Sequence, residues 1–422
     1  MSPNASNPIQ IPWGAWYLQP ESLMLNFPSR WTIQSFTTKN SPSIQNTLDI
    51  IKNAITNPIG TPPLSEMAKG KQSIAIVIED ISRPSKLDTT LNVVFNELEK
   101  AGIHRDQITI IGAIGAHRPM TREDYIKKLS KEIWQSVNIE NHHPYENLIY
   151  LGESKTGTPI HVNKTYYEAD LKIAIGTVIP HPLAGFGGGA KLILPGISGI
   201  ETLLGNHQAG VRGIGIGLGI ISELRKDIED VCKKVGLDFS INLVSNPNRE
   251  ISGIFAGDYI QAHRKAVDFA KDVYSFPLPK LKKEDQADIA FFNLYPEDLE
   301  FTQSIKWINL FLLCSSLLKR NAPCVIMTAC PEGRGFHSLS GETGSKMFQN
   351  WSENPVIGSL LSKRKLLVFS PNLSKYDVYH SYSKETLLFH EFSDLINFIQ
   401  IELPENAKAA LFPNSLSLPV KE

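Results

Sequence analysis

A glycine-rich segment that ends in a lysine carries the strongest chemical signal in this sequence. It extends from His181 to Lys191, and the glycines that precede the lysine are Gly185, Gly187, Gly188 and Gly189. Glycines let the backbone approach a ligand closely, and successive N–H groups in such a loop form a nest of the size of a phosphate. The segment is not a nucleotide-triphosphate loop, because leucine follows Lys191 where that motif needs serine or threonine, and it lacks a dinucleotide fingerprint. We therefore predict a phosphate-sized backbone nest here.

Polar side chains also follow two earlier apolar segments. Asp80 and Arg83 come after the apolar segment 73–78, and His117 comes after 107–112. Arginine offers a planar, permanently charged fork for a carboxylate or a phosphate, and Asp80 can orient it or bind a ligand hydroxyl. A surface arginine and an aspartate at a helix entry are the structural alternatives.

Histidines and the lysine offer further chemistry. His117 and His181 both follow apolar segments, and histidine is the side chain best suited to exchange protons near neutral pH. His207 is a candidate metal ligand, because neutral imidazoles suit Zn, Ni or Cu. Lys191 either pairs with a phosphate as a point charge or, when desolvated, acts as a nucleophile or covalent anchor. The residue types leave these roles open, and a structural role is the alternative for each histidine.

Gln303 and Lys306 stand three residues apart near the start of a predicted helix at 299–319. Side chains at this spacing project from one face of a helix. The face binds a ligand if it lines a cleft between domains; otherwise it is solvated.

The elements that position these residues alternate between strand and helix. Strands are predicted at 73–78, 107–112, 147–151 and 171–178, with helices at 87–101 and 121–137 between them. Such alternation predicts a parallel sheet covered by helices, and ligands bind beyond the carboxyl ends of its strands. Asp80, Arg83, His117 and His181 all lie just past such ends. A second glycine run, at 213–219, has a period of two and predicts a flexible or tightly packed loop.

The length of 422 residues predicts two domains. A Pro-rich, charged linker at 275–285 separates the first alternation from a second one, which has strands at 289–293, 324–328 and 365–369. We predict two α/β domains with mainly parallel, helix-covered sheets. The first spans residues 1–275, with 1–70 mostly a lead-in, and the second spans 284–400. The C-terminal tail 402–422 is predicted to return to the first domain.

Composition excludes several classes of partner. The hydrophobic fraction of 42%, the charged fraction of 20% and the net charge of -1 are those of a soluble globular protein with no broad electrostatic partner such as nucleic acid or an anionic membrane. No apolar stretch is long enough to span a bilayer, and the start of the sequence does not have the pattern of a signal peptide. The four cysteines show no CxxC spacing, which favours buried thiols in a reducing compartment. We predict a cytoplasmic protein that acts on a small molecule.

Taken together, these residues resemble the nickel-dependent lactate racemase family. The resemblance covers about residues 73–335, and it rests on the order and spacing of Asp80-x-x-Arg83-Pro84, the segment Gly115 to Thr121 around His117, the segment His181 to Lys191, Pro195-Gly196, His207 and Gln303-x-x-Lys306. It implies two α/β domains with the active site in the cleft between them. It also implies that the chain is an isomerase, a racemase or epimerase of lactate or a related 2-hydroxy acid.

The resemblance further implies a cofactor, the nickel-pincer nucleotide, which is a pyridinium mononucleotide that binds Ni through two sulfurs and a carbon. Lys191 would tether it through a thioamide, His207 would be the protein ligand to nickel, and the loop Gly187-Gly188-Gly189 would hold its phosphate. Asp80 would contact the cofactor or the substrate. Proteins that synthesise the cofactor would be partners.

By the same resemblance, His117 and His181 would be paired acid/base residues, while Arg83, Gln303 and Lys306 would bind the substrate. A zinc-dependent hydrolase that uses His117, His181 and His207, and a non-catalytic nucleotide-binding protein, are the alternatives. A redox enzyme that uses free NAD is a further alternative, distinguished by net formation or consumption of a 2-keto acid.

Overall fold

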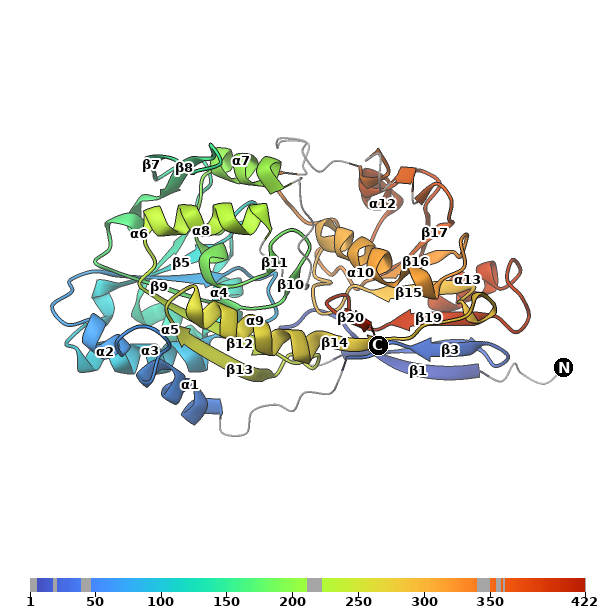
Figure 1. Ribbon diagram of the computed structural model, residues 1–422, viewed down its shortest axis with the longest axis horizontal. Coiled ribbons are helices and arrows are strands. Elements are labelled where there is room, and N and C mark those ends of the chain that lie inside the picture. The colour runs from blue at the N-terminus through green and yellow to red at the C-terminus, as the bar shows by residue number, and fades with distance from the viewer. Residues whose placement is uncertain are drawn as a thin grey trace. The chain divides into compact units, whose positions relative to one another are not determined.

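The chain folds into two compact units, which differ from the predicted domains. The computed structural model describes residues 6–17, 21–38, 47–210, 222–339, 350–353, 358–359 and 361–421. The central unit is Asn40–Val273, and the terminal unit combines Met1–Lys39 with Tyr274–Glu422 (Figure 1). The glycine run at 213–219 lies outside the described residues.

The terminal unit contains a parallel sheet that includes strands from both the N-terminal and the C-terminal parts of the chain. Its strand order is β18-β17-β16-β15-β19-β3. Strand β19 (Lys408–Phe412) lies between β15 (Ile289–Asn293) and β3 (Thr32–Ser35). The prediction that residues 402–422 return to the first domain is therefore wrong. Side chains on both faces of β19 are buried within this sheet, with the Phe412 ring stacked 4.9 Å from that of Phe292.

The N-terminal residues also belong to the terminal unit, which corrects their prediction as part of the first domain. Strand β1 (Ser6–Trp13) pairs antiparallel with β2 (Glu21–Pro28). Ile11, Leu25 and Phe27 are almost completely buried and pack in one cluster with the sheet of the terminal unit. This ribbon stays with that unit because its apolar face needs a core to cover it.

The remaining elements of the terminal unit follow in order. Strand β14 (Ser275–Leu278) pairs in parallel with β20 (Leu418–Lys421), so the predicted linker begins as a strand. The others are β16 (Cys324–Met327), β17 (Leu366–Phe369), β18 (Leu387–Phe389), α10 (Lys306–Cys314), α12 (Lys375–Ser381) and α13 (Phe392–Ile399).

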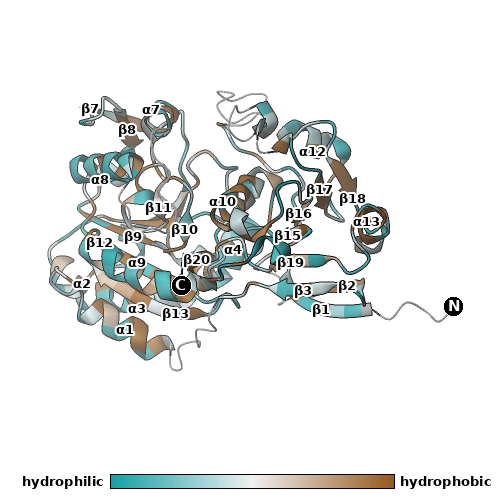
Figure 2. Cartoon of the chain, turned by 45° about the vertical axis from the view of Figure 1, so that its right-hand side comes forward, coloured by the Kyte–Doolittle hydropathy of each residue, from teal (hydrophilic) through white to brown (hydrophobic). Residues whose placement is uncertain are grey.

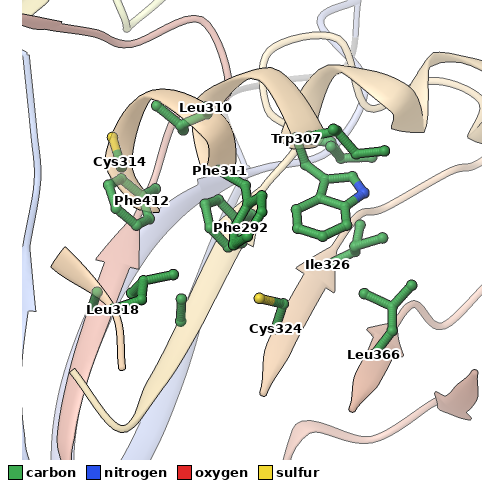
Figure 3. Packing of buried hydrophobic residues seen from close by; sticks show 14 of the residues in the cluster. Phe292, Trp307, Leu310, Phe311, Cys314, Leu318, Cys324, Ile326, Leu366 and Phe412 are labelled. Carbon is green, nitrogen blue, oxygen red and sulfur yellow. The ribbon is translucent and has the colours of Figure 1, made fainter. Parts of the chain in front are cut away.

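An aromatic core anchors α10 in this unit. Figure 3 shows Trp307 and Phe311 of α10 together with Phe292 of β15 and Phe412 of β19. The indole N–H of Trp307 also donates to the hydroxyl of Tyr382 at 3.0 Å. Burial of several large aromatic side chains on one helix fixes its position strongly, and the start of α10 is the place where Lys306 stands.

The central unit contains a second sheet, with the strand order β13-β12-β9-β4-β5-β6. Its strands are β4 (Ile74–Glu79), β5 (Ile108–Ala113), β6 (Asn138–Asn141), β9 (Leu171–Thr177), β12 (Phe239–Ser245) and β13 (Ile251–Gly257). All neighbouring pairs are parallel except the pair of β12 with the edge strand β13. Every residue of β4 is buried, as expected for a central strand covered on both faces. The predicted mainly parallel α/β fold is confirmed.

Helices of the central unit connect these strands. They are α1 (Thr47–Thr56), α2 (Leu64–Met67), α3 (Asp88–Lys100), α4 (Arg122–Leu129), α5 (Lys131–Ser136), α6 (Lys164–Glu168), α7 (Ile200–Gly210), α8 (Glu223–Val235) and α9 (Gln261–Tyr274). Figure 2 shows α8 as largely hydrophilic, in contrast to strand β17. The single helix predicted at 121–137 is divided at Ser130, which has a φ of 87° and caps α5 by accepting a hydrogen bond from Ile133. Among the described residues, no helix has the length and apolar character that a membrane span requires.

One predicted strand lies outside the main sheet. The segment at 147–151 forms part of β7 (Leu148–Glu153), which pairs antiparallel with β8 (Pro159–Asn163) in a separate hairpin. Two short strands, β10 (Pro180–His181) and β11 (Gly185–Phe186), follow β9 and pair with each other in a separate two-stranded sheet.

The order of connections in the central unit predicts where a ligand binds. After β4 the chain adds β5 and β6 on one side, and it later adds β9 and β12 on the other side of β4. Ligands of open α/β sheets bind beyond the carboxyl ends of the strands where the order reverses. In this sheet that position lies beyond β4 and its two neighbours, β5 and β9.

Candidate active site

The structure places four predicted site residues beyond three adjacent strands of the central unit. Asp80 and Arg83 follow β4, His117 follows β5, and His181 ends β10 just after β9. Because β5, β4 and β9 run parallel, these residues all come from the same edge of the sheet.

Asp80 and His117 are in direct contact. The Asp80 Oδ2 atom lies 2.5 Å from His117 Nδ1, while Oδ1 accepts hydrogen bonds from the Ser82 amide at 3.1 Å and the Ser82 hydroxyl at 2.7 Å. Burial by itself would raise the pKa of Asp80, but His117, Arg83 and these hydrogen bonds together lower it well below its usual range. The carboxylate is therefore ionised, and it holds the proton of the His117 ring on Nδ1. In the neutral ring, Nε2 then carries the lone pair that accepts a proton.

His181 has the opposite arrangement. Its Nδ1 atom accepts hydrogen bonds from the backbone N–H groups of Leu183 at 3.3 Å and Ala184 at 3.1 Å. In the neutral ring the proton must then be on Nε2. In their neutral forms the two rings thus carry the proton on different nitrogens, Nδ1 in His117 and Nε2 in His181.

The glycine loop is closely packed and buried. The Gly187 amide donates to the Ile179 carbonyl at 2.8 Å, and the Gly189 amide donates to Asn242 Oδ1 at 3.0 Å. A Cβ on Gly188, which has a φ of +72°, would lie 2.7 Å from the Val178 side chain. Glycine is therefore required at position 188 for packing against the residue that follows β9, and two of the amides predicted to hold a phosphate already donate to protein oxygens. A role for Gly187, Gly188 and Gly189 in binding the cofactor stays a prediction.

A buried cluster of His263, Arg225 and Arg264 contacts this loop. His263 on α9 is 2% exposed, and its Nε2 lies 2.8 Å from the Gly187 carbonyl oxygen. Its Nδ1 lies 3.0 Å from Arg225 and 3.1 Å from Arg264. Burial first, and then the nearby Arg225, lower the pKa of His263 well below its ordinary value. Arg225 contacts Nε2 as well as Nδ1, so the ring lies between the two arginines and the Gly187 carbonyl.

Lys191 and His207 are close enough to interact electrostatically. Lys191 lies on a 3-10 helix, Gly189–Leu192, directly after the glycine loop, and His207 lies on α7. Burial is the main cause that lowers the pKa of His207 to about 4; the hydrogen bond with Leu203 opposes this shift, and the charge of Lys191 contributes to it. His207 Nδ1 lies 2.7 Å from the Leu203 carbonyl oxygen and donates its proton there. The ring is thus neutral with its lone pair on Nε2, which is the form that binds a metal.

These features fit a metal-bearing group attached to Lys191. A single neutral imidazole beside a lysine suits a metal that receives its other ligands from a cofactor. In the described part of the chain, no group of three or more His, Cys, Asp or Glu side chains is arranged to hold a metal ion. The zinc site that the hydrolase alternative builds from His117, His181 and His207 is therefore not what the described residues form.

Gln303 and Lys306 belong to the terminal unit. Gln303 lies in a 3-10 helix, Phe301–Ile305, and Lys306 begins α10. They are 8% and 7% exposed, so a solvated helix face is excluded as their explanation. Lys306 Nζ forms a buried ion pair with Glu297, and Gln303 Nε2 donates to Glu300 Oε1 at 3.3 Å. Both side chains are held by buried carboxylates of their own unit.

Several buried polar residues near the site could not be recognised as important from the sequence. Lys128 looks like a solvated lysine of a helix, and Glu79 looks like the last residue of a strand. Asn242 and His263 are distant in sequence from the loop that they contact. His142 stands in an irregular polar stretch, yet it is completely buried and its Nε2 lies 2.9 Å from the Ser198 carbonyl oxygen.

The buried ring of His142 predicts a loss of stability in mild acid. Burial lowers the pKa of His142 from 6.5 to about 4. Above pH 6.5 the ring is neutral in both the folded and the unfolded chain. Below that value the unfolded chain binds a proton that the folded chain does not, so the free energy of unfolding falls as the pH falls from 6.5 towards 4.

Between pH 7 and pH 5 we expect this one ring to remove about 2 kcal/mol of the free energy of unfolding. Chemical denaturation at both pH values should show that His142→Gln lacks this part of the pH dependence. The exposed His104 provides a matched control, because His104→Gln should retain it. An equal loss in wild type and His142→Gln would contradict the prediction.

Comparisons with known proteins relate this chain to one family. Residues 18–215 match the family model described as the lactate racemase N-terminal domain. The chain is 30% identical over 324 residues to the lactate racemase of Thermoanaerobacterium thermosaccharolyticum, covering 75% of this chain and 72% of the relative. It is 28% identical over 340 residues to the lactate racemase of Lactiplantibacillus plantarum, covering 78% of this chain and 77% of the relative.

Two solved structures share the fold. The lactate racemase apoprotein from Thermoanaerobacterium thermosaccharolyticum has a TM-score of 0.75 at 23% identity, covering 99% of this chain and 100% of that one. A Thermotoga maritima protein has a TM-score of 0.66 at 16% identity, covering 89% and 98%. At these identities the likeness concerns the fold, and it confirms the predicted α/β architecture.

Proposed function

Because this chain belongs to the lactate racemase family, we propose that it inverts the configuration of lactate or a related 2-hydroxy acid. The proposed route is a reversible hydride transfer through a planar 2-keto acid, with a covalently tethered nickel-pincer nucleotide as the cofactor. The curated relatives are racemases, so the chain is assigned to the isomerases. Lactate is the first substrate to test, because both relatives are named for it.

The pairing of Asp80 with His117 is the observation that carries the proposal. An ionised, buried carboxylate on Nδ1 leaves Nε2 of the histidine as a proton acceptor, which is what the hydroxyl of a 2-hydroxy acid requires. The pair lies at the same sheet edge as His181, at the position where ligands of such sheets bind.

The chemistry of the substrate favours a hydride over a proton. The carboxylate next to the reacting carbon already carries a negative charge, so it stabilises a carbanion poorly. Removal of the α-hydrogen with its electron pair, while a histidine takes the hydroxyl proton, forms a neutral carbonyl instead. Return of the hydride to the other face of the planar carbon inverts the centre.

Two histidines then serve the two enantiomers. His117 starts as an acceptor at Nε2, and His181 starts with a proton on Nε2. The histidine that takes the hydroxyl proton of the incoming substrate becomes an imidazolium, and an imidazolium returns a proton to the carbonyl oxygen of the planar intermediate and becomes neutral again. The second histidine serves the opposite enantiomer.

Lys191 and His207 are proposed to hold the cofactor. Lys191 provides the amine for a thioamide link, and the neutral His207 provides an Nε2 lone pair for nickel. When bound, the cofactor supplies an electrophilic carbon that accepts and returns the hydride. Cofactor-synthesising proteins are the partners that this proposal requires.

Arg83 is proposed to bind the carboxylate of the substrate with its planar fork, because it follows the same strand as Asp80. The roles of Gln303 and Lys306 in substrate binding stay predictions. Lys306 Nζ is an ammonium with three protons, so its ion pair with Glu297 is compatible with a further carboxylate contact.

Chiral chromatography of a panel of 2-hydroxy acids tests the proposal. The protein is expressed together with cofactor-synthesising enzymes and incubated with each pure enantiomer. We expect either enantiomer of at least one acid to become a racemic mixture while the total hydroxy acid stays constant. Net conversion to a 2-keto acid would indicate a free-NAD enzyme, and no conversion of any acid by the nickel-loaded protein would contradict the proposal.

A further inference from the structure

Lys128 is a fully buried cation that the reaction described above does not use. It lies on α4, in the central unit, and its side chain is 0% exposed. Its Nζ donates to the carbonyl oxygens of Arg83 at 3.0 Å and Ser85 at 3.1 Å, and to the Ser85 hydroxyl at 3.3 Å. A backbone hydrogen bond connects the same two segments, because the Leu87 amide donates to the Lys128 carbonyl at 2.8 Å. The turn that carries Arg83 is thus attached to α4 at several points.

Glu79 extends this network to the next strand. It is buried at the end of β4, and its Oε1 lies 3.7 Å from Lys128 Nζ and accepts a hydrogen bond from the Ser85 hydroxyl. Its Oε2 accepts hydrogen bonds from the amide and the hydroxyl of Thr177, at 2.6 and 2.8 Å. Thr177 ends β9, the strand that leads to His181. A Cβ on Gly176 would lie 3.1 Å from Oε2, so a glycine at this position makes room for the carboxylate.

Stability alone does not explain a buried ion pair of this kind. Removing two charges from water costs several kcal/mol per ion, and apolar side chains of similar volume often stabilise a protein as well or better. The pair instead fixes the orientation of its neighbours, because an ammonium has three protons and a carboxylate has two oxygens for directional hydrogen bonds. Those groups are the backbone of the Arg83 turn on one side and the end of β9 on the other.

We propose that Lys128, together with Glu79, is a positioning residue that fixes the Arg83 turn relative to the end of β9 and thereby aims the Arg83 side chain at the carboxylate of the substrate. The expected effect on the kinetic constants rests on the proposed function, whereas the expected effect on the position of the Arg83 turn does not. Lys128 touches no reacting atom, and its effect on the reaction passes through Arg83.

A double variant, Glu79→Gln with Lys128→Met, tests the inference without leaving an unpaired buried charge. Because Arg83 binds the substrate carboxylate in the ground state and in the transition state alike, we expect KM to rise about 10-fold to 100-fold while kcat changes little. The exposed Lys127 on the same helix provides the matched control, and Lys127→Met should leave both constants unchanged.

The same substitutions in an Arg83→Ala background separate positioning from general damage. If Glu79 and Lys128 act through Arg83, replacing both in the Arg83→Ala variant changes KM less than twofold relative to Arg83→Ala alone. A full additional loss in that background, or a fall in kcat that parallels a loss of folded protein in thermal unfolding, would overturn the inference.

A crystal structure of the double variant gives a result that does not depend on activity. We expect the turn from Arg83 to Ser85 to be displaced relative to wild type in the same crystal form, and an unchanged turn would overturn the inference. Absence of racemisation by the loaded wild-type protein would refute the proposed function instead, and the structural comparison would still decide the role of Lys128.

Discussion

Lys191→Ala is expected to lose all covalently held cofactor and to reduce racemisation to background. Alanine has no amine, so no thioamide link can form, and the cofactor would have to be held by non-covalent contacts alone. The position of Lys191 supports this outcome, because its charge acts on His207, the proposed nickel ligand. Intact-protein mass spectrometry under denaturing conditions, after co-expression with the cofactor-synthesising enzymes, measures the adduct directly.

Two further variants decide what Lys191 does. Lys191→Arg keeps a positive charge without the reactive amine, so it should also lack the adduct if the lysine is a covalent anchor. Retained activity in Lys191→Arg would instead mean that the residue acts as a point charge for a phosphate. Lys155 in the same unit has an 83% exposed side chain, and Lys155→Ala should retain the adduct, one nickel per chain and visible absorbance.

His117→Ala should keep the cofactor and lower kcat for both enantiomers by about 10²-fold to 10⁴-fold, the usual contribution of a general acid or base. The loss concerns proton transfer, because the side chain that accepts the hydroxyl proton is absent while Lys191 and His207 are intact. Measurement of initial rates from each pure enantiomer, with the mass adduct recorded for the same preparation, separates catalysis from cofactor loading.

Asp80→Asn extends this prediction to the residue that orients the ring. An asparagine in place of the ionised carboxylate no longer holds the ring proton on Nδ1, so the proton acceptor at Nε2 is lost in part of the molecules. The double variant Asp80→Asn with His117→Ala should be no slower than His117→Ala alone, since the two residues act as one unit. The exposed His143 is the control; normal rates in His117→Ala, or slow rates in His143→Ala, would refute the paired mechanism.

The placement of the site at the ends of three strands could be predicted from local patterns. Apolar segments at 73–78, 107–112 and 171–178 predict strands, and the structure has β4, β5 and β9 there. The polar residues that follow them therefore lie at one edge of a sheet. The pairing of Asp80 with His117 could not be predicted, because it depends on which strands become neighbours.

The glycine loop shows where sequence and structure differ most. Its composition predicts a nest of free amides for a phosphate, whereas the amides of Gly187 and Gly189 already donate to Ile179 and Asn242. Sequence shows that a segment lacks side chains, but it does not show whether a ligand or another part of the protein fills the space. Lys128 is a similar case, since a buried lysine and a solvated lysine look alike in a helix.

The sequence by itself determined the alternation of strands and helices, the residue types available for proton transfer and the membership of a family, because each depends on neighbouring residues or on their order and spacing. The tertiary structure decided which sheet the two ends of the chain join. An apolar segment such as 408–412 satisfies either sheet equally well, and only the packing of Phe412 against Phe292 places it in the terminal unit. The tertiary structure also decided that the proton of the neutral ring lies on Nδ1 in His117 and on Nε2 in His181, because hydrogen-bond partners brought together by folding set the position of each ring proton.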